Sequence, residues 1–334
     1  MRYLIPGLGA AILLACADSA SEAPAETEEP IVTETVTNAV SNIPDGMEVL
    51  DPGAIRDSYR RHAVQTQFRR WFQLYENPEV SLDNQLAILT GDARIVSGLG
   101  EAVGHDAYRA RVSDIPREWK NAHFVRDTDI TLAPDGSAQL VADVLYLNQG
   151  ALPDGAIREA ELTYRTQLTA PDGMLPRFES VTIEGVREGT AESYRDAYPE
   201  NRVLSLVHYW LAGIEHPDRD PEPFRQMLLD DGFELRFSSG TITDFEGFKA
   251  WLAGPASAVD YSSHTVRDFA VEETAPNAYA ASMVFDWQGL APDGTELVAR
   301  TRHNWTVEDN PSEAFARVKT VDVEVLTPFQ PLIR

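Results

Sequence analysis

The chain has 334 residues, of which 43% are hydrophobic and 9% aromatic, enough apolar material for two domains of ordinary size. Its 53 acidic and 28 basic residues give a formal net charge of −25. A field of this sign repels polyanions, so the composition argues against nucleic acid and against an anionic membrane face as partners of the folded part.

The N-terminus has the features of a secretory signal. Arg2 precedes an apolar run from Leu4 to Leu14, and the single cysteine of the chain, Cys16, follows Ala15. The run is too short to cross a bilayer as a mature helix. "LLAC" resembles the lipobox of bacterial lipoproteins, so we expect residues 1–15 to be a signal peptide and Cys16 to be lipidated. Ordinary cleavage after Ala17 is the alternative.

The resemblance to lipoproteins also implies a cellular location. Ala17, rather than an aspartate, follows Cys16, which by the lipoprotein sorting rule implies a lipid anchor in the cell envelope, at the periplasmic face of the outer membrane. Residues 16–46 are rich in Ala, Glu, Thr, Pro and Ser. Such a composition cannot bury a core, so we expect a disordered tether between this anchor and the folded body.

Helices are predicted first in the folded part. Asp51-Pro52 is a helix start, with a capping residue followed by proline. Phe68, Trp71, Phe72 and Tyr75 then recur three and four residues apart on one helical face. A short helix capped by Ser81, a strand over 93–97 and a helix over 104–112 follow, with four strands after residue 122. Three Pro-Asp-Gly turns separate these strands, beginning at Pro134, Pro153 and Pro171.

The same order then repeats. We expect a helix over 201–215, a short helix after Asp220-Pro221, a strand over 233–238 and a helix opened by a capping box at residues 243–246. His-x-Val-Arg-Asp begins the strand region of both copies, at His123 and at His264, and "NQGALPDG" is echoed by "WQGLAPDG". The chain is therefore an internal duplication with one small insertion or deletion.

This element order and the His-x-Val-x-Asp motif resemble the nuclear transport factor 2-like superfamily, in its SnoaL-like branch. The resemblance implies an α+β fold with two tandem cone-shaped (cystatin-like) domains, each with helices packed in a strongly bent antiparallel sheet. The expected domains are residues 47–187 and 188–334. Strand residues 141–147 are apolar on both alternating faces, which predicts a sheet covered on both sides. We expect the second copy to supply one cover, in an intramolecular pseudo-dimer.

The strand register brings possible site residues together. A two-residue turn at Asp135-Gly136 would place His123 opposite Asn148 and Val125 opposite Tyr146. The same register in the second copy places His264 opposite Trp287 and Val266 opposite Phe285. Arg126 and Arg267 then lie on the other face, near Asp143 and Asp286. One face of each copy thus combines histidine with aromatic side chains, and the candidate ligand-binding residues are His123, Tyr146, Tyr164, His264, Phe285, His303 and Trp305. Leu162 and Tyr164 are the expected counterparts of His303 and Trp305.

Catalysis has weaker support in the sequence. Asp143 is a candidate base, with His123 and Tyr146 as its partners, because a site like that of the ketosteroid isomerases, which are members of the superfamily, needs a carboxylate base and acid or hydroxyl donors converging on one carbonyl oxygen. The predicted register instead puts Asp143 on the opposite face from His123, where a structural pair with Arg126 explains it. The histidines show no metal-ligand spacing, and we predict neither metal nor cofactor.

Three functions remain open. The first is a tethered lipoprotein that binds a small apolar ligand or serves as an interaction module. The second is an isomerase, cyclase or hydrolase that acts on a lipophilic substrate in the first copy. The third is a structural scaffold whose cones are filled by side chains. Fold resemblance alone does not decide between them.

Overall fold

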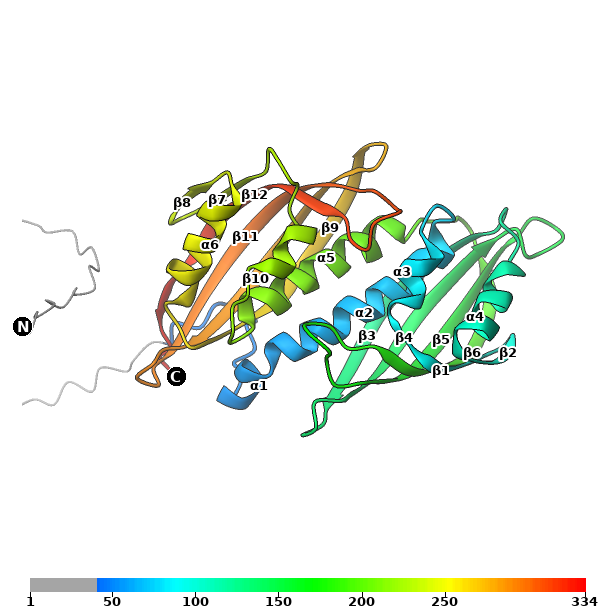
Figure 1. Cartoon of the computed structure of the whole chain (residues 1–334), viewed down its shortest axis with the longest axis horizontal. Helices are drawn as coiled ribbons and strands as arrows, with labels where there is room; N and C mark the ends of the chain where they lie inside the picture. Colours follow the sequence, from blue (N-terminus) through cyan, green and yellow to red (C-terminus); the bar gives the residue numbers. More distant parts are fainter. Residues whose placement is uncertain (1–40) are drawn as a thin grey trace, which may run out of the picture. The chain divides into compact units, whose positions relative to one another are not determined.

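The computed structural model describes residues 41–334, which belong to one compact unit. The predicted signal peptide, Cys16 and most of the tether lie outside the described residues. Two copies of one architecture follow each other along the chain, each with a long helix and a bent sheet (Figure 1). Within residues 41–334, no helix has the length and apolar character needed to cross a membrane.

The first copy contains four helices and six strands. In chain order they are α1 (Pro52–Arg56), α2 (Ser58–Glu76), α3 (Leu82–Leu86), β1 (Leu89–Ser97), β2 (Gly100–Val103), α4 (Gly104–Ser113), β3 (Lys120–Leu132), β4 (Ala138–Gln149), β5 (Ile157–Leu168) and β6 (Phe178–Ala191). The predicted caps are present: Asp51 Oδ1 accepts the backbone N–H of Gly53 at 2.7 Å, and Ser81 Oγ accepts that of Asp83 at 3.2 Å.

The second copy repeats this plan. Its elements are α5 (Tyr198–Glu215), the 3₁₀ helix η1 (Glu222–Gln226), β7 (Glu234–Phe237), β8 (Gly240–Ile242), α6 (Phe245–Ala253), the 3₁₀ helix η2 (Pro255–Ser257), β9 (Tyr261–Ala275), β10 (Ala278–Leu290), β11 (Glu296–Glu308) and β12 (Arg317–Pro331). The cap of α6 is Asp244, which accepts the Gly247 N–H at 2.7 Å, so the cap lies one residue later than the predicted Thr243, and Glu246 does not complete a capping box.

Both sheets have six strands rather than the four of the predicted meander. Their orders are β2-β1-β6-β5-β4-β3 and β8-β7-β12-β11-β10-β9. The meander strands pair antiparallel, whereas β1 pairs parallel with β6, and β7 with β12. The α+β fold with two tandem cones is therefore confirmed, with a short hairpin extending each sheet by two strands.

The register of the first copy differs from the prediction. The turn after β3 spans residues 133–137, with the Gly136 N–H donating to Ala133 O, and β3 carries a bulge between Val125 and Asp127. These irregularities place His123 opposite Tyr146 rather than Asn148. In the second copy a two-residue turn joins β9 to β10, and His264 lies opposite Trp287 and Val266 opposite Phe285, as predicted.

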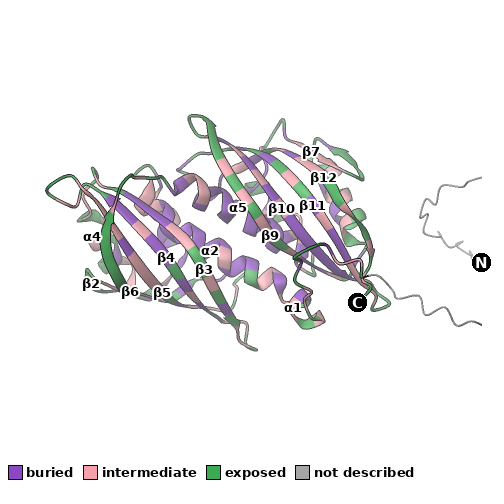
Figure 2. Ribbon diagram, turned by 180° about the vertical axis from the view of Figure 1, so that it is seen from behind, coloured by how far each residue is buried: buried purple, intermediate pink, exposed green. Residues whose placement is uncertain are grey.

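Each long helix lies on the inner face of its own sheet. Phe68, Trp71 and Phe72 of α2 are at most 1% exposed and pack with buried residues of β4, β5 and β6. Val203, Leu206 and Trp210 of α5 pack in the same way in the second copy. Figure 2 shows this alternation of buried and exposed residues along the strands.

The two copies meet through their long helices. α2 and α5 run side by side between the two sheets (Figure 1). The side chain of Arg202 on α5 is fully buried there, donating to Asp309 Oδ1 at 2.8 Å and to Gln73 Oε1 of α2 at 2.9 Å. Its other donors bind backbone carbonyls, so this buried cation has a complete set of partners.

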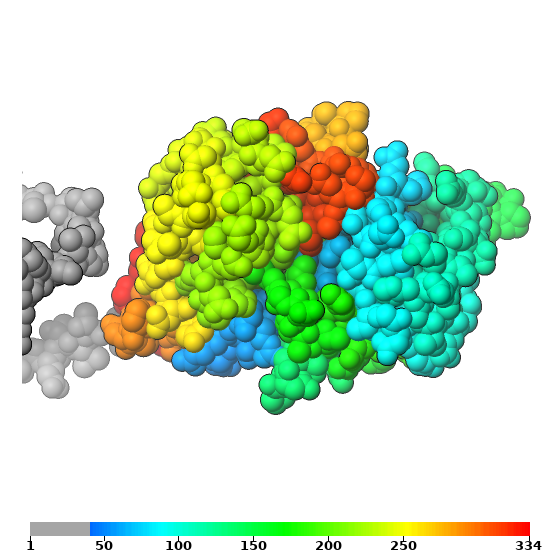
Figure 3. All heavy atoms as spheres, viewed as in Figure 1, coloured from blue at the N-terminus to red at the C-terminus, as the bar shows by residue number. Residues whose placement is uncertain are grey.

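The outer face of the first sheet is covered by the segment that connects the copies. Leu145 and Leu147 point away from α2 and pack with Ala197 and Tyr194. The Tyr194 hydroxyl donates to Asn121 O at 2.9 Å. A connecting segment rather than the second sheet therefore explains why this strand is apolar on both faces. In the space-filling view the two copies form a continuous surface over residues 41–334 (Figure 3).

Candidate active site in the first copy

A histidine and a glutamate form the centre of the first cone. His123 lies near the start of β3, and Glu76 is the last residue of α2, which ends just before Asn77-Pro78. His123 Nδ1 is 3.1 Å from Glu76 Oε1, and the His123 backbone N–H donates to the same oxygen at 2.8 Å. The carboxylate thus selects the tautomer with hydrogen on Nδ1 and leaves Nε2 with a lone pair.

The second copy completes the environment of this carboxylate. Asn201 on α5, which is fully buried, donates to Glu76 Oε1 at 3.0 Å and to the His123 carbonyl at 2.9 Å. Burial raises the pKa of Glu76, although its hydrogen bonds with His123 and Asn201 oppose that effect. The side chain of Glu76 is itself fully buried.

A cavity of about 460 Å³ opens beside this pair. Its walls are mainly aromatic and aliphatic side chains from α2, α4 and the sheet: Trp71, Ile95, Val112, Ile115, Trp119, Leu162 and Ile183. His123, Tyr146 and Tyr164 line it as well. An apolar cleft of this size with a few converging polar groups is typical of small-molecule sites.

Two polar groups line the cavity with hydrogen-bonding capacity that the protein does not use. Within residues 41–334, Nε2 of His123 makes no hydrogen bond to the protein, and the Tyr164 hydroxyl accepts from Trp71 but donates to no protein atom. Both rings pack against Phe72, with centroid distances of 4.7 and 5.5 Å. Burial raises the pKa of Tyr164, so its hydroxyl keeps its proton and remains a donor. A base and a donor therefore flank the same space.

The structure brings some of the predicted site residues together in the cavity and places others elsewhere. His123, Tyr146 and Tyr164 come together in the cavity, with the Tyr146 hydroxyl donating to Asn121 Oδ1 at 2.7 Å. Asp143 does not join them: it is exposed on the opposite face and accepts a hydrogen bond from Thr163 Oγ1 at 3.0 Å. The predicted role of Asp143 as a base with His123 is therefore wrong, because β4 alternation directs it outward.

The two copies differ in the expected arginine–aspartate pairs, of which only the second is formed. Arg126 pairs with Glu161 at 3.2 Å, not with Asp143, because the bulge in β3 displaces it from the diagonal position. Arg267 does pair with Asp286, at 3.0 Å, as predicted.

The second copy repeats the histidine–glutamate pair but fills its interior. His264 Nδ1 is 2.8 Å from Glu215 Oε1, and the His264 backbone N–H donates to that oxygen at 2.7 Å. The predicted ligand residues Phe285 and Trp305 are each 1% exposed and belong to the hydrophobic core. His303 stacks on Phe285 at 4.4 Å. These three side chains are packing residues, so the expected pocket role does not hold for them.

The register also corrects the predicted correspondence between copies. Tyr146 pairs with Ala160, and its counterpart Trp287 pairs with Ala299. Counting along β5 and β11 from these alanines, His303 matches Tyr164, and Trp305 matches Thr166. The predicted matches, Leu162 and Tyr164, were two residues out of step because the turn before β11 is shorter.

Glu76 and Asn201 were not predicted. Both long helices end in Glu-x-Pro, as Glu76-Asn77-Pro78 and Glu215-His216-Pro217, and alignment of the copies on this repeat would have identified the two carboxylates. Asn201 is set by helix packing, for which the sequence carries no comparable signal. In the described range, no three His, Cys, Asp or Glu side chains are placed to hold a metal ion.

Comparison with known proteins gives likenesses of fold. No family model matches the chain, and no curated protein matches it. A crystallised hexachlorocyclohexane dehydrochlorinase is 14% identical, covers 43% of this chain and 97% of its own, and has a TM-score of 0.38. A nuclear transport factor 2-like superfamily protein from Salmonella enterica is 12% identical over 37% of this chain and 87% of its own, with a TM-score of 0.33. A cystatin-like protein from Caulobacter vibrioides is 18% identical over 38% and 89%, with a TM-score of 0.30.

Proposed function

We propose that the first copy binds a small, mainly apolar molecule and moves a proton on it, as an isomerase or a lyase does. The observation that carries this proposal is the His123 ring, which Glu76 holds through Nδ1 at 3.1 Å while Nε2 faces a cavity of about 460 Å³. Isomerisation and elimination both begin when a base removes a proton from carbon.

The roles of the residues follow from their contacts. His123 Nε2 accepts the proton, and Glu76 stabilises the imidazolium that forms. The Tyr164 hydroxyl donates to the oxygen or leaving group on which negative charge develops. The apolar walls exclude water, which strengthens both interactions. Binding without chemistry is the second candidate, and it is favoured by the aromatic lining alone.

Deprotonation of a small carbon acid, which does not depend on specific binding contacts, tests directly whether His123 acts as a base. The probe is 5-nitrobenzisoxazole, whose ring opens on deprotonation of carbon and whose product is followed by absorbance. We expect the full chain to accelerate this reaction, and His123→Gln to lower the rate by about 100-fold, the usual contribution of a positioned general base.

The duplication supplies the matched control. His264→Gln makes the same change in the pair of the second copy, where the interior is filled by side chains. We expect both variants to lose stability by about 1–3 kcal/mol, because each leaves a buried glutamate short of a donor. Equal rates for His264→Gln and His123→Gln would contradict a catalytic role for His123 and leave binding as the function.

We further propose that the chain is a lipoprotein anchored through Cys16 at the periplasmic face of the outer membrane. The position of the single cysteine after an apolar run supports this proposal. Phase partition in a detergent that clouds on warming tests it: the chain should enter the detergent phase, and Cys16→Ser should move it to the aqueous phase. Aqueous partition of the unaltered chain would refute the anchor.

A further inference from the structure

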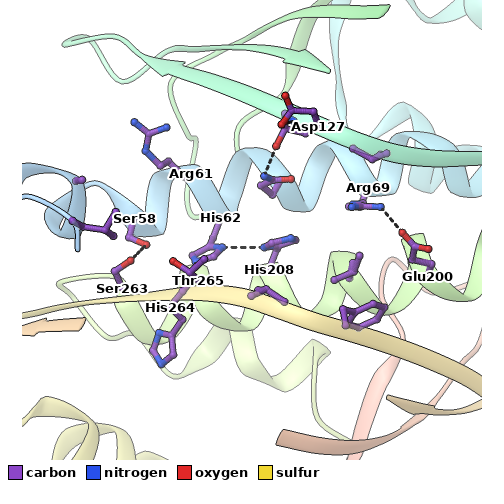
Figure 4. Close-up of a pocket in the computed structure, with 18 of the residues that line it drawn as sticks. Ser58, Arg61, His62, Arg69, Asp127, Glu200, His208, Ser263, His264 and Thr265 are labelled. Atoms are coloured by element: carbon purple, nitrogen blue, oxygen red, sulfur yellow. Dashed lines mark hydrogen bonds and ion pairs between the residues drawn. The ribbon is translucent and has the colours of Figure 1, made fainter. Parts of the chain in front are cut away.

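A second cavity, of about 550 Å³, lies between the two copies. Its lining comes from α2, α5, β3 and β9, and Figure 4 shows Ser58, His62 and Arg69 of α2 facing His208 and Glu200 of α5 and Ser263 of β9. The Ser58 and Ser263 hydroxyls are 2.9 Å apart and join the two copies at one end. The cavity of the first cone shares no lining residue with this space, and His123 and Glu76 do not line it, whereas His264 of the second copy does.

The lining of this cavity is less acidic than the chain as a whole. Acidic residues outnumber basic ones by 53 to 28 overall, whereas the cavity is lined by three arginines and two acids: Arg61, Arg69, Arg126, Asp127 and Glu200. Arg69 pairs with Glu200 and Arg126 with Glu161, so an anionic ligand would bind through the donors that these pairs leave unused.

Arg69 is the most enclosed of these cations. Its side chain is 10% exposed, and Nη1 donates to Asn201 Oδ1 at 2.8 Å and to Glu200 at 3.2 Å. Its Nε is buried without a hydrogen-bond partner. A buried guanidinium with unused donor capacity is the group that a carboxylate satisfies in a planar geometry.

A chain of hydrogen bonds leads from a buried acid to the same space. Glu215 Oε1 is 3.4 Å from His62 Nε2, and His62 Nδ1 is 2.9 Å from His208 Nδ1. The charged or titratable groups around these two histidines are Arg69, Asp127, Glu200, Glu215 and His264. His208 lines the cavity, and in the described residues its Nε2 makes no hydrogen bond to the protein.

The two facing Nδ1 atoms share one hydrogen. When it resides on His62, that ring is a cation between Glu215 and His208, and His208 carries its own hydrogen on Nε2, toward the cavity. When it resides on His208 and both rings are neutral, Nε2 of His208 has only a lone pair. An anion in the cavity stabilises the first state, which holds one more proton.

We propose that the cavity between the copies is a second ligand site, which binds a small carboxylate through Arg69 and Nε2–H of His208 and takes up one proton on binding. Leu204, Val266 and Phe269 also line it and can cover a short aliphatic tail. The ligand class is therefore a short-chain monocarboxylate.

Calorimetric titration of the full chain with hexanoate tests this site. We expect one saturable site per chain, and heats in two buffers of different ionisation enthalpy that reveal uptake of one proton. His208→Gln and Arg69→Gln should each weaken binding by about tenfold, the effect of losing one hydrogen bond to a charged group. Arg60→Gln, on the same helix but outside the cavity, should bind as the unaltered chain does.

Two results would overturn the proposal. One is the absence of saturable binding. The other is binding that persists unchanged in both His208→Gln and Arg69→Gln, which would place hexanoate elsewhere, such as in the cone. Using two variants from different helices keeps the test valid if one of them fails to fold.

Discussion

The same histidine–glutamate pair occurs in two different electrostatic settings. Burial raises the pKa of Glu76, which meets one histidine and the neutral Asn201. Burial acts in the same direction on Glu215, but the two histidines His62 and His264 bring its pKa down to about 2. The carboxylate of the second copy is thus held as an ion by its neighbours, whereas that of the first copy binds a proton more readily and lies beside an open cavity.

His303 predicts a dependence of stability on pH. Burial lowers its pKa to about 3, and its Nδ1 is buried without a partner. Between pH 6.5 and about pH 3 the unfolded chain binds a proton at this residue and the folded chain does not. Stability is therefore full above pH 6.5 and falls as the pH drops through this window. Chemical denaturation at several pH values should show this slope.

Substitution of His303 measures its contribution to the dependence of the unfolding free energy on pH. His303→Gln should reduce the loss of unfolding free energy by up to about 1.4 kcal/mol per pH unit, the value for one proton. His216→Gln, at a more exposed position after α5, is the control. An unchanged slope in His303→Gln would show that this histidine is protonated in the folded chain.

At the scale of elements, α2 and α5 share a polar seam. It repeats every seven residues, with His62, Arg69 and Glu76 on α2 and Asn201, His208 and Glu215 on α5. Residues of one helix bind those of the other, as in Asn201 to Glu76 and His62 to Glu215. The seam links the two carboxylates and the cavity between the copies, so each copy supplies polar groups to the other.

Asn201→Leu tests this dependence of the first copy on the second. The change removes a donor from Glu76 and from the His123 carbonyl, so we expect a loss of about 1–3 kcal/mol in unfolding free energy. We also expect a lower rate with 5-nitrobenzisoxazole, because the change removes a hydrogen bond that favours the charged form of Glu76, which is the form that stabilises the imidazolium of His123.

Ser205→Ala is the matched control for that variant. It removes the hydrogen bond from Gln73 Nε2, 2.9 Å long, at the same helix interface but away from Glu76. It should lower stability and leave the rate unchanged. If the two variants reduced the rate equally, Asn201 would have only a structural role.

Much of this element plan is readable from the sequence, because helix starts and turns depend on local residues. Asp51, Ser81 and the Pro-Asp-Gly turns act within a few positions of themselves. The strand register was not readable in the first copy, since the bulge near Arg126 and the length of one turn shift it. The role of Glu76 escaped prediction for a related reason: its partners lie 47 and 125 residues away, and only tertiary packing unites them.

At the scale of the whole molecule, the two copies differ in whether the interior of the cone is open. The first cone keeps an open cavity beside its histidine. In the second, Trp210, Phe224, Phe248, Phe285 and Trp305 are at most 3% exposed and occupy the corresponding interior. The second copy holds α5 against α2 and places Asn201 in contact with Glu76 of the first site.

Native mass spectrometry of the purified full chain, with extraction of whatever co-purifies, tests most directly whether the first cone binds a ligand. The account predicts one small apolar molecule per chain, and less of it in Leu162→Trp, which narrows the first cavity. Two molecules per chain, both retained in His208→Gln, would show that the second cone is also open. A chain that is empty and gains no mass when incubated with small aromatic ligands would contradict the central claim that the first cone is a binding site.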